Sequence, residues 1–322
     1  HEPGGAAAVM KGDGFGGDLG PLLIDGFGPG DPGRIIVEEL GVSARVRALR
    51  EDRGIVMPGF SLNKPEKYEG PYWRRDKLKE LFPEERKGLE RYYRFYTRML
   101  RVLSLIRKLQ YPANPRSLTV IMLKLLLAVT ALPVRKTINW SAEQLMDHYF
   151  RSPELKVFFL GIVADFVTAP SEFPAPGVPT IHMETAFDKR IPVYPGTKSA
   201  QIGYSYILGG CGSLVSAVYG AVESAGGSIH TGKEVKRILI ENNRASGVEL
   251  ADGTKDTSDT VIATGGMREV FFELVGWENL PAEFAEQIEK NRLMESILMV
   301  QLGIDFDPRP YQAQALCYYY LT

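Results

Sequence analysis

The segment from residue 207 to residue 266 constrains the fold of this chain more than any other part of it. Three glycines, Gly209, Gly210 and Gly212, come just before an apolar helical pattern, which a Gly-Gly turn ends. Short runs with β-strand character follow and finish in small residues. This order of glycine turn, helix and strands is typical of a platform beside a bound dinucleotide. The segment therefore predicts an α/β domain with a cofactor site.

The two turns of this segment have properties suited to a ligand. Glycine has no Cβ atom, so the backbone at the first turn can approach a ligand closely. The helix that we expect to begin near Ser213 offers free N–H groups and the positive end of its dipole. A second turn, at Thr264, Gly265 and Gly266, closes a strand that we expect from residue 261 onward. The alternative interpretation is a tight strand-to-helix turn that binds nothing.

Two other stretches match the dinucleotide pattern G-x-G-x-x-G, at residues 12–17 and 28–33. That pattern needs a buried strand before it and an uninterrupted helix start after it. Residues 6–10 are too few and too small to form a central strand, and Pro29 and Pro32 interrupt the second match. We expect both stretches to be turns in a flexible loop and not phosphate-binding loops.

The clearest helical signals lie outside the glycine-rich parts of the chain. In residues 77–109, apolar side chains that include Tyr92 and Tyr96 recur at spacings of three and four, which places them on one helix face. We expect that face to pack in the core, with the lining of an apolar ligand tunnel as the alternative. Shorter helices are expected at residues 32–41, which end in a glycine, and at residues 141–150, which open with a capping box.

The most apolar run of the chain is residues 118–132, in which Lys124 is the only charged residue. The run is shorter than the ~20 residues that a bilayer-spanning helix needs. Two interpretations stay open: a helix buried in the protein, or a helix that lies at a membrane interface.

Strand signals are shorter and more scattered. Residues 45–49 and 55–57 predict a pair of short strands. Residues 296–303 have the pattern of a strand, and residues 311–321, which are rich in aromatic side chains, predict another.

The alternation of these patterns predicts an α/β fold with an inserted domain. Residues 1–60 and 192–275 are glycine-rich with strand signals, and we assign them to a Rossmann-like cofactor domain that is incomplete. Residues 61–191 are assigned to a largely helical substrate or membrane-facing domain inserted in it. Residues 276–322 are expected to be a strand-rich segment that returns to the substrate domain.

Composition excludes several classes of protein. The net charge of −1 gives no electrostatic reason to bind nucleic acid, and we expect basic stretches such as residues 86–107 to be solvated helix faces. Cys211 and Cys317 are the two cysteines, and neither belongs to a CxxC motif, so no metal cluster or redox dithiol is predicted. So few cysteines favour a reducing, intracellular location, either cytoplasmic or on a membrane surface.

The chain resembles FAD-dependent oxidoreductases of the phytoene desaturase and retinol saturase type, within the amine-oxidase-like flavoproteins. Residues 209–214 are similar to the Gly-Gly-x-Gly-x-Leu of that family, residues 247–253 to its hairpin, and residues 261–266 to its next strand. Near the N-terminus, Gly4-Gly5 and residues 18–21 resemble the segment that follows the family's second strand.

This resemblance implies that the cofactor is FAD and that the chain lacks part of the cofactor domain, since no strand and glycine fingerprint precede Gly4. It implies that Gly4 and Gly5 approach the pyrophosphate, although Ala6 replaces the usual arginine after them. It also implies that residues 18–21 lie near the flavin ring. The cofactor-binding residues implied in this way are Gly4, Gly5, Asp18, Leu19, Gly20, Pro21, Gly209, Gly210, Gly212, Val235, Thr264, Gly265 and Gly266.

No catalytic residue is assigned, because a flavin can accept a hydride with little help from side chains. His148 and His182 are candidate proton donors or bases, with surface or structural histidines as the simpler interpretation, and His230 is expected to be structural within a strand. Asp165 lies amid Phe158, Phe159 and Phe166 in a helix expected at residues 153–167. Burial there would raise its pKa and make it usable as an acid.

The function implied by the resemblance is desaturation or saturation of C–C bonds in an apolar, polyprenoid or carotenoid-like substrate. Hydride transfer to or from the flavin would carry out this reaction. Two alternatives stay open: another flavoenzyme of this type, such as an amine or porphyrinogen oxidase, and a non-catalytic binding protein on a membrane surface. The oligomeric state and the electron acceptor are open as well.

Overall fold

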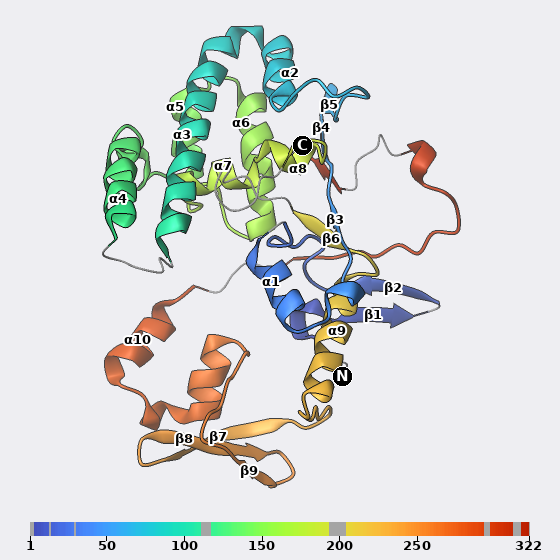
Figure 1. Ribbon diagram of the computed structural model, residues 1–322, viewed down its shortest axis with the longest axis vertical. Coiled ribbons are helices and arrows are strands. Elements are labelled where there is room, and N and C mark those ends of the chain that lie inside the picture. Colours follow the sequence, from blue (N-terminus) through green and yellow to red (C-terminus); the bar gives the residue numbers. More distant parts are fainter. Residues whose placement is uncertain are drawn as a thin grey trace. The chain divides into compact units, whose positions relative to one another are not determined.

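The computed structural model describes residues 3–12, 14–28, 30–110, 117–192, 204–292, 297–311 and 317–321. The chain divides into two compact units, drawn as ribbons in Figure 1. The larger unit comprises residues 4–225 and 296–322, and the smaller one comprises residues 1–3 and 226–295. Helices and strands occur in both units. The domain boundaries expected near residues 60, 191 and 275 stay a prediction.

Helices build the main core of the larger unit. One apolar cluster joins α2 (Trp73–Leu81), α3 (Arg86–Gln110), α5 (Ala142–Tyr149), α6 (Pro153–Leu160), α7 (Val178–Ile181) and α8 (Glu184–Phe187). Six aromatic side chains in this cluster are at most 1% exposed: Tyr92, Tyr96, Phe150, Phe158, Phe159 and Phe187. The rings of Phe150 and Phe159 stack at a centroid distance of 5.3 Å. Core packing of the aromatic face is therefore confirmed.

Local sequence signals account for where several helices begin and end. The helix expected at residues 77–109 is two helices, because Pro83 opens a 3-10 turn between α2 and α3. The capping box at the start of α5 is confirmed, since Ser141 and Gln144 each bond the other's backbone. α1 (Pro32–Glu39) also forms as expected, and Gly41 follows it with a φ of +70°.

Among the described residues, the strands of the larger unit form three small sheets. β1 (Val9–Gly12) and β2 (Phe15–Asp18) make an antiparallel hairpin, and β3 (Ala48–Arg50) pairs antiparallel with β6 (Ser205–Ile207). β4 (Arg53–Met57) lies between β5 (Phe60–Leu62), which is antiparallel to it, and β10 (Cys317–Tyr320), which is parallel.

The expected pairing of residues 45–49 with residues 55–57 is wrong. Only Glu51 and Asp52 link β3 to β4, and a two-residue hairpin turn favours glycine or asparagine. The N–H of Glu51 instead donates to the carbonyl of Tyr204 at 3.1 Å, which extends the ladder between β3 and β6. The chain therefore continues from one sheet into the next without reversing.

A second, smaller core joins distant parts of the larger unit. Val37, Val42 and Val46, which lie in and after α1, pack with Ile207 of β6 and Ala217 of α9 (Cys211–Ser224). This cluster packs α9 and β6 against α1 and the residues after it, and the bond from the N–H of Cys211 to Asp18 brings the start of α9 to the N-terminal hairpin.

α4 (Leu118–Ala131) presents its apolar side chains to solvent. Seven large apolar residues in and just after this helix are 50–73% exposed: Leu118, Ile121, Met122, Leu125, Leu126, Val129 and Leu132. The interpretation of this run as a buried helix is therefore wrong, because only a narrow side of α4 contacts α3. Within the described residues, no helix is both long and apolar enough to cross a membrane.

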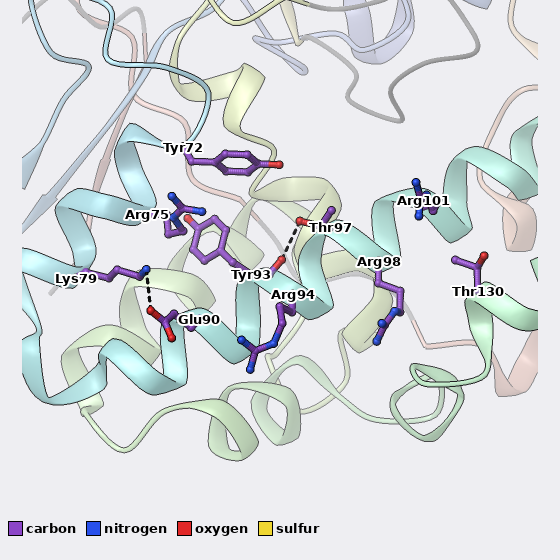
Figure 2. A pocket seen from close by; sticks show the side chains of 10 residues that line it. All are labelled: Tyr72, Arg75, Lys79, Glu90, Tyr93, Arg94, Thr97, Arg98, Arg101 and Thr130. Carbon is purple, nitrogen blue, oxygen red and sulfur yellow. Dashed lines mark hydrogen bonds and ion pairs between the residues drawn. The ribbon is translucent and has the colours of Figure 1, made fainter.

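A groove of about 510 Å³ follows α3 and reaches α2 and α4 (Figure 2). Five basic side chains line it, with a single carboxylate among them. The lining residues are Tyr72, Arg75, Lys79, Glu90, Tyr93, Arg94, Thr97, Arg98, Arg101 and Thr130. We call this feature the basic groove.

In the described residues, the smaller unit is an antiparallel meander followed by helical segments. β7 (Val235–Glu241) pairs with β8 (Arg244–Leu250), which pairs with β9 (Lys255–Thr257), so the hairpin expected at residues 247–253 is confirmed. Asn242 and Asn243 form the first turn with φ values of +49° and +62°. A π-helical segment (Glu269–Gly276) and α10 (Ala282–Lys290) follow.

Two expected strands do not form. Residues 261–266 are irregular, with the side chain of Ile262 exposed, and residues 297–303 are irregular as well, with Leu298 exposed. A strand is stabilised by a paired neighbour and a buried face, and neither segment has these among the described residues. Of the strand expected at residues 311–321, the structure contains β10, while residues 312–316 lie outside the described residues.

Candidate cofactor site

A hollow of about 750 Å³ lies between the β1–β2 hairpin and the turn that precedes α9. Six of its eleven lining residues are glycines, so its wall is largely backbone. The lining residues are Val9, Lys11, Gly12, Gly14, Phe15, Gly16, Gly17, Asp18, Tyr206, Gly209 and Gly210. We call it the glycine hollow. It brings together two regions of the sequence that were expected to share a site.

Asp18 connects these two regions directly. Its buried carboxylate, at the end of β2, accepts a hydrogen bond of 2.8 Å from the N–H of Cys211, the first residue of α9. A carboxylate in this place stabilises the positive end of the helix dipole. Gly210 has a φ of +80°, and a Cβ atom on it would lie 2.6 Å from Oδ1 of Asp18. Glycine is therefore required at residue 210 for both conformation and space.

The start of α9 agrees with the expectation in place but not in its N–H groups. The helix begins at Cys211, two residues before Ser213, and two of its first N–H groups already have partners. The N–H of Cys211 bonds Asp18, and that of Ser213 donates to the carbonyl of Gly210 at 3.1 Å. Gly212 lies outside the lining of the hollow, because it faces β1: a Cβ atom there would be 2.4 Å from Cγ2 of Val9.

The other N-terminal candidates lie beside the hollow and not in its wall. Gly4 and Gly5 have φ values of +129° and +53° and open a 3-10 turn. A Cβ atom on Gly20 would lie 1.9 Å from the carbonyl oxygen of Ala6, so these two backbones cross closely. The carbonyl of Pro21 accepts a bond of 3.0 Å from the thiol of Cys211. Their contact with a cofactor stays a prediction.

Leu19 and four residues of the smaller unit complete the set of candidates. The N–H of Leu19 donates to the carbonyl of Ala8 at 3.0 Å, and its side chain is exposed. Val235 begins β7 opposite Leu250. A Cβ atom on Gly265 would be 3.3 Å from Val270. Gly265 lies with Thr264 and Gly266 in the irregular stretch before the π-helical segment. The roles of all five stay predictions.

The three candidate histidines have different surroundings. His182 is fully buried, and its Nε2 lies 2.8 Å from the carbonyl oxygen of Phe159. Its pKa is well below the ordinary value, mainly because of burial and also because of the positive charge of Arg74. Exposed His148 contacts Arg91 at 3.1 Å, and partial burial and that charge lower its pKa. The expectation of a strand at His230 is wrong, since residues 227–230 are irregular.

The expectation of a buried Asp165 is also wrong. α6 ends at Leu160 and continues as a 3-10 helix (Gly161–Phe166), whose tighter winding changes which side chains face the core. Asp165 is exposed there and accepts a hydrogen bond of 2.5 Å from the hydroxyl of Tyr319.

A buried charged pair near this point was not predicted. Glu51 is fully buried, and its Oε1 lies 2.8 Å from Nε of Arg53. Burial raises the pKa of the Glu51 carboxyl to about 7, although the positive charge of Arg53 acts to lower it. The guanidinium of Arg53 also lies 4.4 Å from the ring centroid of Tyr204. A carboxyl with such a pKa can give and take a proton near neutral pH. The one signal in the sequence is a run of four charged residues, at positions 50–53, between the two expected strands.

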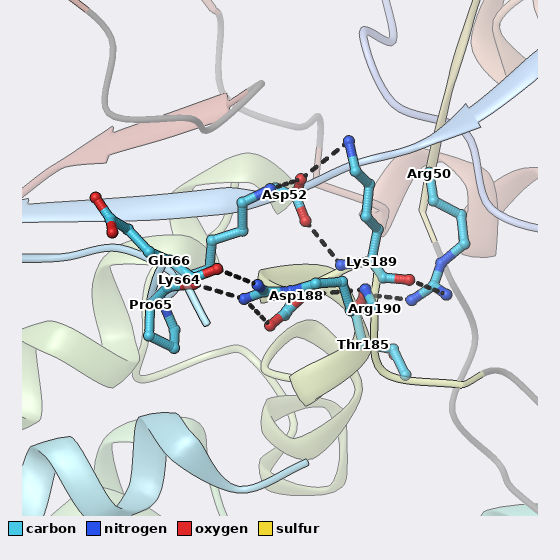
Figure 3. A network of polar contacts seen from close by, with 9 residues as sticks. All are labelled: Arg50, Asp52, Lys64, Pro65, Glu66, Thr185, Asp188, Lys189 and Arg190. Carbon is cyan, nitrogen blue, oxygen red and sulfur yellow. Dashed lines mark hydrogen bonds and ion pairs between the residues drawn. The ribbon is translucent and has the colours of Figure 1, made fainter. Parts of the chain in front are cut away.

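Asp52, beside this pair, anchors a wider polar network (Figure 3). Its carboxylate accepts bonds from Nζ of Lys64 at 2.5 Å and from the N–H of Lys189 at 2.7 Å. Arg50 donates to the carbonyls of Thr185, Lys189 and Ile191. The network fastens residues 185–191 to β3 and to the link after it.

The chain belongs to the family of flavin-containing amine oxidoreductases, whose family model matches residues 1–309. The resemblance to amine-oxidase-like flavoproteins, the Rossmann-like α/β fold class and the FAD cofactor are thereby confirmed. Within the described residues, no cluster of side chains has the composition of a metal site.

Three individual proteins show how far the similarity extends. Pyridine nucleotide-disulfide oxidoreductase domain-containing protein 2 of Mus musculus is 27% identical over 164 residues, which is 50% of this chain and 26% of that protein. Chloroplastic prolycopene isomerase of Daucus carota is 22% identical over 313 residues, or 96% of this chain and 48% of that protein. The crystal structure of an oxidoreductase from Methanosarcina mazei superposes with a TM-score of 0.52 at 22% identity, covering 89% of this chain and 56% of the other. The chain thus spans about half or less of these relatives' sequences.

Proposed function

We propose that the protein is an FAD-dependent oxidoreductase that desaturates or saturates C–C bonds in an apolar, polyprenoid or carotenoid-like substrate. Family membership supports the flavin chemistry. Support for the substrate class comes from the relative named for the isomerisation of prolycopene, whose similarity extends over 96% of this chain.

The observation that carries the proposal is that Asp18 and the Gly209–Gly210 turn line the same hollow. The residues present fit the flavin ring better than the pyrophosphate, because a phosphate here would face the carboxylate of Asp18 and compete for N–H groups already bonded. An uncharged, planar ring can approach the glycine backbone without that repulsion. When bound, the flavin supplies the hydride acceptor or donor.

The chain's own groups would then hold and orient the ring. Gly209 and Gly210 would allow close backbone approach, and Tyr206, in the middle of β6, would add an aromatic wall. Asp18 would act on the ring's position through α9, because it fixes the first turn of that helix.

The test is FAD titration of the full-length protein, followed by substrate addition without oxygen. Bound FAD gives a visible flavin spectrum. With phytoene in detergent micelles, we expect the flavin band to bleach while a more conjugated polyene absorbs at longer wavelength. Bleaching by putrescine and not by phytoene would replace this proposal with an amine oxidase. Absence of any bound flavin would overturn it altogether.

A further inference from the structure

The outward side of α4 is an apolar surface that no described residue covers. Its side chains are the seven exposed residues from Leu118 to Leu132 named above. The opposite side carries Val120, Leu127 and Ala131, which are buried or pack against the core. A helix that is apolar on both sides normally lies in a core or in lipid, and contiguous exposed apolar patches mark interaction sites.

A row of cations runs beside this surface. Arg94, Arg98 and Arg101 stand at spacings of four and three along α3, so they share one exposed face. Figure 2 shows them lining the basic groove together with Thr130 of α4, which makes the row and the helix neighbours. Within the described part of the chain, no carboxylate forms an ion pair with these three arginines, whereas Lys79 pairs with Glu90 at 3.2 Å.

The combination of an apolar helix face with an arginine row indicates which partner fits. Helices at membrane interfaces bury an apolar face among acyl chains while neighbouring cations contact anionic headgroups. The 14 residues of α4 extend roughly 21 Å, which is less than the ~30 Å of a bilayer core, so the helix suits the interface and not a span. In a twofold dimer across α4, both arginine rows would border one interface, and their like charges would weaken it.

We propose that the outward face of α4 and the row Arg94, Arg98 and Arg101 dock the protein on a bilayer that contains anionic phospholipid. The apolar face enters the headgroup region, and the arginines contact lipid phosphates at its edge. This docking does not depend on the proposed flavin chemistry.

The test is flotation of the purified full-length protein with vesicles of phosphatidylcholine, either alone or with about one third phosphatidylserine. We expect binding to the anionic vesicles, weakened by salt because surface charges are screened. The triple variant R94Q/R98Q/R101Q should bind these vesicles at least ~10-fold more weakly, given the contribution of each arginine near an anionic surface. The control K236Q/R244Q/K255Q removes the same number of exposed cations from the smaller unit and should bind like the wild type.

The apolar face is tested in the same way. L118S/L125S should lose most binding, while L298S/L302S, which replaces two exposed leucines elsewhere, should not. All four variants should keep the flavin spectrum of the wild type, which separates this proposal from the proposed function. Equal binding by test and control variants would overturn it. Two further outcomes would overturn it. One is a dimer, measured by light scattering, that dissociates in the L118S/L125S variant. The other is binding of inorganic pyrophosphate through the three arginines without any binding to vesicles.

Discussion

At the scale of single residues, Gly210 offers the sharpest test of the candidate site. Gly210→Ala would place a Cβ atom 2.6 Å from the carboxylate of Asp18 at a positive φ, and we expect a loss of ~2–4 kcal/mol in the free energy of unfolding. Gly59→Ala is a matched control, because Gly59 also has a positive φ but has open space around it. We expect ~1 kcal/mol for the control. Urea denaturation compares the two, and equal losses would show that residue 210 is not crowded.

The raised pKa of Glu51 predicts that the free energy of unfolding depends on pH. Its pKa is about 7 in the folded protein and ordinarily 4.5, so the folded state binds this proton more tightly than the unfolded state. The stabilisation is present below pH 4.5 and lost as pH rises to 7, by ~3 kcal/mol. Glu51→Gln should flatten this part of the stability curve, and exposed Glu143→Gln should leave it unchanged. Denaturant titrations between pH 4.5 and 8 measure both, and an unaltered slope in Glu51→Gln contradicts the assignment.

At the scale of elements, the capping box of α5 should contribute a measurable amount to the free energy of unfolding. Ser141→Ala removes the acceptor for the N–H of Gln144, and we expect the free energy of unfolding to fall by ~1 kcal/mol. Ser224→Ala, in the last turn of α9, removes only a bond to the carbonyl of Gly220 and should change little. Thermal unfolding of both variants provides the comparison. Similar midpoints would mean that the box contributes nothing.

Elements were predictable from the sequence where their cause is local. Three signals lie within a few residues of the helix end or turn that they determine. They are the capping box at Ser141, the glycine after α1 and the asparagine turn after β7. The pairing of β3 with β6 and the bond from Cys211 to Asp18 depend on residues more than 150 positions apart, so no local pattern contains them. The exposure of α4 could not be predicted from the sequence for another reason, because the apolar composition of this helix is that of a buried helix.

At the scale of the whole molecule, the smaller unit has its own buried apolar side chains, while the main core belongs to the larger unit. We expect calorimetry of the full-length protein to show two transitions, each sensitive to the packing of one unit. Ile238→Ala, at the buried residue of β7, should lower one transition, and Phe159→Ala, in the main core, should lower the other, each by a few kcal/mol of stability. A single transition that both variants shift equally would mean that the units unfold together.

The parallel pairing of β10 with β4 affects how this chain is made. Residues 53–57 leave the ribosome before their partner, residues 317–320, which comes about 260 residues later. At roughly 5–20 residues per second, the edge of β4 stays open on the order of tens of seconds during synthesis. An open strand edge can pair with other chains, so chaperone capture during translation should fall mainly on this sheet. Strand β10 thus closes the edge of a strand that is synthesised about 260 residues before it.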